Sequence, residues 1–101
     1  MTDPSTIADL IRRALDGYAG LISLGEAVED EWSYVNDLAG AWTARLEAVA
    51  DGRGANAASP AQADAIERAL DEIASITDPH RAIDWLSTFP QVVLVAIGER
   101  P

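Results

Sequence analysis

Residues 26–51 read EAVEDEWSYVNDLAGAWTARLEAVAD, and this stretch decides the fold class. Its apolar residues alternate spacings of four and three: Val28, Trp32, Val35, Ala39, Trp42, Leu46 and Val49. That spacing places them on one side of an α-helix. The acidic start, Glu26 to Glu31, complements the positive end of the helix dipole, and Gly52 supplies a stop. The sequence therefore predicts a long amphipathic helix over 26–51.

The residues before this stretch carry the same kind of pattern. Their apolar side chains fall on one side of a helix: Ile7, Leu10, Ile11, Ala14, Leu15, Tyr18, Leu21 and Ile22. Asp3 followed by Pro4 predicts an N-cap with proline in the first turn, and Gly25 is a natural stop. We expect a first amphipathic helix that begins after Asp3 and ends near Gly25.

A third helix is predicted beyond a small, polar loop over 53–59. Ser59 followed by Pro60 gives an N-cap with proline at the first helical position. An apolar stripe follows: Ala63, Ile66, Ala69, Leu70, Ile73, Ala74 and Ile76. The helix should stop before Asp78, because the residue that precedes a proline disfavours helical geometry.

Pro79 and Pro90 divide the C-terminal part of the sequence into segments. Asp78 and Pro79 repeat the cap-plus-proline signature and predict a short helix over about 79–88. Pro90 is expected to interrupt the chain again. The segment 91–97, QVVLVAI, is apolar on all sides, so periodicity does not distinguish a buried helix from a strand. A helix is favoured, because no other strand candidate exists to pair with it.

Together these patterns predict an all-α protein with a single helical domain over residues 1–101. We expect a small helical bundle of three long amphipathic helices plus one or two short C-terminal helices. No repeat of about 20–50 residues is visible, which excludes a solenoid.

Charge and composition exclude several classes of function. The net charge is −10, and every basic residue is an arginine. Such acidity argues against direct binding of nucleic acid or of an anionic membrane. No apolar run approaches the roughly 20 residues that span a bilayer, and Met1–Pro4 does not resemble a signal peptide. Because cysteine is absent, which fits a reducing compartment, we expect a cytoplasmic protein.

The acidity is unevenly distributed along the chain. Residues 26–51 contain seven acids and one arginine, and residues 60–78 contain five acids and one arginine. From residue 79 onward two acids balance two arginines. The predicted second and third helices are therefore acidic, and the C-terminal part is neutral and apolar.

No set of residues has the spacing of a catalytic, metal or phosphate site. The run Glu29–Glu31 lacks the loop of an EF-hand, and consecutive carboxylates on a helix point in different directions. Glu31 lies among apolar positions, so it is either solvated at the end of the stripe or partly buried with a raised pKa. His80 is the only histidine, and no nucleophile signature accompanies it. We expect no enzyme, no cofactor and no metal site.

The aromatic residues are expected to lie mostly in the core, since aromatics at helical spacing usually do. Two of them are better candidates for exposed contacts. Tyr34 lies at the edge of its stripe, and Trp85 lies on a short helix that would not cover an indole fully.

These observations favour a small protein-interaction module, such as an adaptor, regulator or accessory subunit. The apolar segment 91–97 needs a cover, so self-association as a homodimer is expected. A further protein partner would be basic. The candidate interaction residues are Glu26, Glu29, Asp30, Glu31, Tyr34, Asp37, Trp85 and Phe89. Two alternatives stay open: an acidic decoy that occupies a basic nucleic-acid-binding site, and a small-molecule binder with a pocket between helices near Glu31 or His80.

Overall fold

Four α-helices make up the computed structural model, which describes residues 6–100. They are α1 (Ile7–Glu26), α2 (Trp32–Arg53), α3 (Pro60–Ala74) and α4 (Pro79–Ala96), with a short 3-10 helix, η1 (Glu29–Glu31), before α2. Residues 6–100 contain no strand beyond one isolated bridge between Thr6 and Ala57. The prediction of a small all-α bundle is confirmed, although its last helix is longer than expected.

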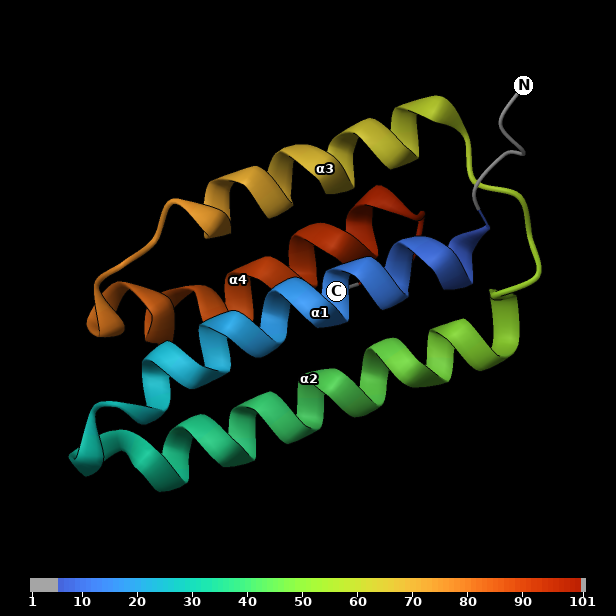
Figure 1. Cartoon of the computed structure of the whole chain (residues 1–101). Helices are drawn as coiled ribbons and strands as arrows, with labels where there is room; N and C mark the ends of the chain where they lie inside the picture. Colours follow the sequence, from blue (N-terminus) through green and yellow to red (C-terminus); the bar gives the residue numbers. More distant parts are fainter. Residues whose placement is uncertain (1–5, 101) are drawn as a thin grey trace.

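The helices are arranged around a central pair formed by α1 and α4. Helix α2 packs on one side of this pair and α3 packs on the other, and α2 and α3 do not contact each other (Figure 1). The molecule measures 46 × 25 × 19 Å along its principal axes. Because α2 and α3 lie on opposite sides of the central pair and do not contact each other, each turns a large part of its surface to solvent.

Helix α1 begins later than the sequence predicted. Thr6 is its N-cap and forms a capping box with Asp9, with Thr6 Oγ1 accepting from the Asp9 N–H at 3.2 Å. The amide of Ile7 donates to the carbonyl of Asn56 at 2.9 Å, so the loop after α2 satisfies a free donor of the first turn. The predicted cap at Asp3 and Pro4 lies outside the described residues. The helix ends at Glu26, one residue after the predicted stop at Gly25.

Helix α2 also begins later than expected, at Trp32 instead of Glu26. Gly25 is buried, and a Cβ there would lie only 3.3 Å from Val35 and from Ile83, so α2 passes close to the end of α1. The chain must reverse at this point, and Val28 adopts extended backbone with φ −91° and ψ 96°. The apolar spacing continues across the reversal although the helix does not, which is why the sequence alone placed the start too early.

The start of α3 agrees with its prediction. Ser59 caps the helix, Pro60 occupies its first turn, and the side chain of Gln62 completes a capping box by accepting from the Ser59 N–H at 2.9 Å. The helix ends at Ala74, and Ile76 packs into the core from the connection that follows.

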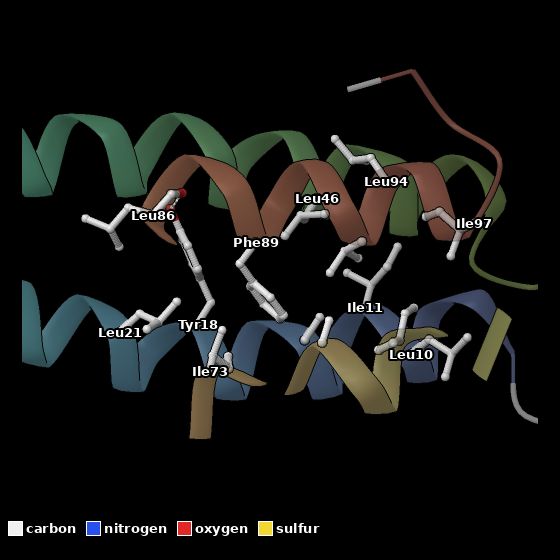
Figure 2. Packing of buried hydrophobic residues seen from close by; sticks show 14 of the residues in the cluster. Leu10, Ile11, Tyr18, Leu21, Leu46, Ile73, Leu86, Phe89, Leu94 and Ile97 are labelled. Atoms are coloured by element: carbon white, nitrogen blue, oxygen red, sulfur yellow. Dashed lines mark hydrogen bonds between the residues drawn. The ribbon is translucent and has the colours of Figure 1, made fainter. Parts of the chain in front are cut away.

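Helix α4 is one continuous helix through Pro90, which corrects the prediction of a break there. Asp78 caps its start as expected, and the favoured helical state of 91–97 is confirmed to Ala96. A proline cannot donate to the carbonyl four residues before it, which here is that of Leu86. Instead, the hydroxyl of Tyr18 on α1 donates to this carbonyl at 2.6 Å (Figure 2). The helix therefore tolerates its internal proline because another helix replaces the missing donor.

The core is one cluster to which all four helices contribute. Tyr18 and Phe89 lie at its centre and stack with ring centroids 6.1 Å apart and an interplanar angle of 21° (Figure 2). Burial raises the pKa of the Tyr18 hydroxyl well above its ordinary value, so the group stays protonated and available as a donor.

Candidate interaction surfaces

Six of the predicted site residues gather at the turn between α1 and α2. Glu29, Asp30 and Glu31 form η1 and are exposed, and Glu26, half-buried, ends α1. Tyr34 is 53% exposed on the first turn of α2, and Asp37 follows it toward solvent. The sequence therefore placed these residues correctly on the surface, and the solvated interpretation of Glu31 is confirmed.

Phe89 does not belong to any surface. Its side chain is fully buried against Tyr18, so its prediction as an interaction residue is wrong. The reason is that α4 continues through Pro90: Phe89 becomes a mid-helix core position instead of the exposed end of a short helix. Trp85, the other predicted residue on this helix, is half-buried and lies at the contact between α3 and α4.

Trp32 departs from its prediction in the opposite direction. It was expected in the core as part of the apolar stripe of the second helix, yet it is 55% exposed. Trp32 is the first residue of α2, and α1 ends before it can cover this end of the apolar stripe, so the indole stays exposed.

A groove runs along the seam between α3 and α4. Its larger part has a volume of about 460 Å³ and is lined by Ala65 on α3 and by Thr88, Gln91, Val92, Val95 and Ala96 on α4. A second hollow of about 240 Å³ shares Ala65 and Val92 with the first and extends to Trp85, Arg68 and Glu72. The two form one groove, which we call the α3/α4 groove.

The α4 side of this groove is uncharged and largely apolar. Val92 is 39% exposed and Val95 is 60% exposed, and these are two of the four large hydrophobic side chains exposed in the described part of the chain. No charged residue occurs from Trp85 to Gly98, in a protein of net charge −10. Sequence reasoning noted that 91–97 needed a cover but did not select Val92 and Val95, because periodicity cannot tell which side of an all-apolar segment is buried.

Another apolar hollow, of about 250 Å³, lies between α1 and α3 and is lined largely by leucine, isoleucine and glycine. Gly17 is one of the residues that line this hollow. A Cβ at Gly17 would lie 2.6 Å from Leu70 Cδ2, so α3 approaches α1 closely at this position. Neither Glu31 nor His80 lines this hollow or the α3/α4 groove. These hollows therefore do not bring the two titratable candidates into a pocket.

The acidic side chains do not form one continuous face. The acids of α2 and those of α3 lie on helices that the α1 and α4 pair separates. Within residues 6–100, the ion pairs are Arg13 with Glu67 at 3.1 Å and Arg53 with Glu99 at 2.7 Å. This separation gives no geometric support to a decoy that would use both helices together.

Among residues 6–100, no group of His, Asp and Glu side chains is placed to hold a metal ion. The described helices also include none with the length and apolar character needed to cross a membrane.

Comparisons with protein families, with characterised proteins and with solved structures gave no match to this chain.

Proposed function

We propose that the chain is a small, non-catalytic protein-interaction module that associates with a second copy of itself through the α3/α4 groove. The observation that carries the proposal is the exposure of Val92 and Val95 beside this groove. Val92 and Val95 line the same hollow, and exposed apolar side chains that adjoin in a groove are typical of an interaction site. As a protein without cysteine, it would act in the reducing cytoplasm.

Charge supports a second copy as the partner at this surface. Two chains of net charge −10 repel each other wherever their acidic faces approach. The α4 side of the groove, within the run from Trp85 to Gly98, is free of charge, and the charged residues that line the groove are Arg68 and Glu72 on α3, which are of opposite sign, so two copies can meet there with little repulsion. A closed two-fold dimer is the commonest form of self-association and uses the same patch on both subunits.

The turn between α1 and α2 is the part of the surface suited to a different, basic protein. Glu29, Asp30 and Glu31 are exposed there beside the half-exposed Tyr34. Such a partner stays a prediction of the charge pattern, and it would bind on a region of the bundle separate from the α3/α4 groove.

Val95→Glu tests self-association most simply. A carboxylate placed in an apolar contact loses its hydration, so we expect the dimer dissociation constant to rise about 10- to 100-fold. Val95 is 60% exposed, which leaves the fold of the single chain little affected. Sedimentation velocity over a range of concentrations would measure the change.

The matched control is Ala48→Glu, which adds the same charge at an exposed position of α2. It should leave the dissociation constant nearly unchanged. An equal rise of the dissociation constant in both variants would mean that the added charge weakens the dimer wherever it is placed, which would contradict a contact at Val95. A parent chain that is monomeric would contradict self-association itself.

A further inference from the structure

The first turn of α2 exposes two aromatic side chains at one end of the bundle (Figure 1). Trp32 is 55% exposed and Tyr34 is 53% exposed. The other two large hydrophobic side chains that are exposed in residues 6–100 line the α3/α4 groove, so this turn is a second, separate surface. An exposed tyrosine or tryptophan offers a partner a large, rigid contact area at a low cost in side-chain entropy.

Helical spacing places a carboxylate on either side of Tyr34 along the helix. Residues three apart on a helix are neighbours on the same face. Asp37 follows Tyr34 by three residues, Glu31, the N-cap of α2, precedes it by three, and both are exposed. Trp32 is not flanked in this way, because Val35, three residues after it, is buried and uncharged. Tyr34 is therefore the exposed ring that has an acid on both sides.

The surroundings of Tyr34 are acidic and contain no cation of their own. Residues 14–44 include six acids and no basic residue. Within residues 6–100, the ion pairs join Arg13 to Glu67 and Arg53 to Glu99, so none of these six acids is paired. The positive end of the α2 dipole amounts to only about half an elementary charge, which the five carboxylates of residues 26–37 outweigh. This surface therefore repels the same turn of a second copy and attracts a cationic group.

An arginine side chain matches both features of this surface. Its planar guanidinium stacks on aromatic faces, and its N–H groups donate to carboxylates in a fixed fork. The ammonium of lysine is a compact, strongly hydrated charge, which gains less from an exposed ring.

From these observations we infer that Tyr34 receives an arginine of a basic partner protein, whose guanidinium stacks on the ring and donates to Glu31 and Asp37. Recognition of this kind rests on the basic partner of the proposed function and specifies what that partner presents. It is independent of self-association through the α3/α4 groove.

Two peptides of equal charge test this recognition. A dye-labelled peptide in which arginine alternates with glycine, and its lysine counterpart, can be titrated with the whole chain and followed by fluorescence anisotropy. We expect the arginine peptide to bind about 2- to 5-fold more tightly, which is the gain of a cation stacked on an exposed ring. Tyr34→Ala should abolish this preference, and Tyr34→Phe, which keeps the ring, should retain it.

A pair of double variants tests the two carboxylates at constant net charge. Glu31→Gln with Asp37→Asn should weaken binding of the arginine peptide about 3- to 10-fold. The Glu31 side chain makes no capping hydrogen bond, so its change to an amide leaves the start of α2 intact. Glu47→Gln with Asp51→Asn removes two charges from exposed positions nearer the end of the same helix. At about 0.1 M salt, where charges are screened beyond about 10 Å, this control should weaken binding less than about 2-fold.

Equal weakening by the two double variants would overturn the inference, because net charge alone would then account for binding. An arginine preference that persists in Tyr34→Ala, or no preference in the parent chain, would also overturn it. In that case a basic partner at this turn still stands if Glu31→Gln with Asp37→Asn weakens both peptides and the control does not. A parent chain that binds neither peptide would remove the basic partner and its arginine together.

Discussion

Replacing Phe89 with alanine is expected to lower the free energy of unfolding by about 3–5 kcal/mol. The phenyl ring is fully buried at the centre of the core and stacks on Tyr18, so its removal loses apolar burial and leaves a cavity between α1 and α4. A domain of this size is typically stable by only about 5–15 kcal/mol, so the variant should be close to unfolding. Urea denaturation followed by circular dichroism at 222 nm would measure the loss.

Trp32→Ala is the informative companion to this variant. Trp32 is 55% exposed at the start of α2, and exposed substitutions usually change stability by no more than about 0.5 kcal/mol. The sequence pattern predicted the reverse, with Trp32 in the core and Phe89 on the surface. If Trp32→Ala cost as much as Phe89→Ala, the placement of both residues described here would be wrong.

Tyr18→Phe is expected to cost about 1–3 kcal/mol, because it leaves the buried carbonyl of Leu86 without a donor. The cost should depend on Pro90. In a Pro90→Ala background the new amide can donate to Leu86 in the ordinary helical way, so removal of the Tyr18 hydroxyl should cost much less. Urea denaturation of the parent, the two single variants and the double variant would give the coupling free energy.

The exposed Tyr34 offers a control for the chemical change itself. Tyr34→Phe removes the same hydroxyl from a side chain that is 53% exposed, and it should have little effect in either background. Equal costs of Tyr18→Phe with proline and with alanine at position 90 would contradict the role assigned to the Tyr18 hydroxyl.

The fold could be predicted from sequence where local chemistry determines it. Ser59 with Pro60 and Asp78 with Pro79 place the starts of α3 and α4 correctly, because caps and first-turn prolines act within a few residues. The continuity of α4 could not be predicted in this way. It depends on a hydrogen bond from Tyr18, which is distant in the sequence from Leu86 and Pro90.

Exposure at the candidate surfaces could likewise be predicted only where the local sequence determines it. Exposure of Tyr34 and of Glu29–Glu31 follows from their positions at the edge of a stripe and in a run of charges. The exposure of Val92 and Val95 depends on which side of α4 faces α1, which an all-apolar segment does not reveal. The exposure of Trp32 could not be predicted, because the apolar pattern continues through the point where the chain reverses direction.

The central claim, self-association through the α3/α4 groove, is tested most directly by sedimentation equilibrium of the unaltered chain at low and high salt. Salt screens the repulsion between two chains of net charge −10 but does not weaken an apolar contact. We predict a dimer at micromolar concentration whose dissociation constant falls as salt rises from about 0.05 M to about 0.5 M. A monomer under all conditions, or a dimer that dissociates as salt is added, would contradict the account.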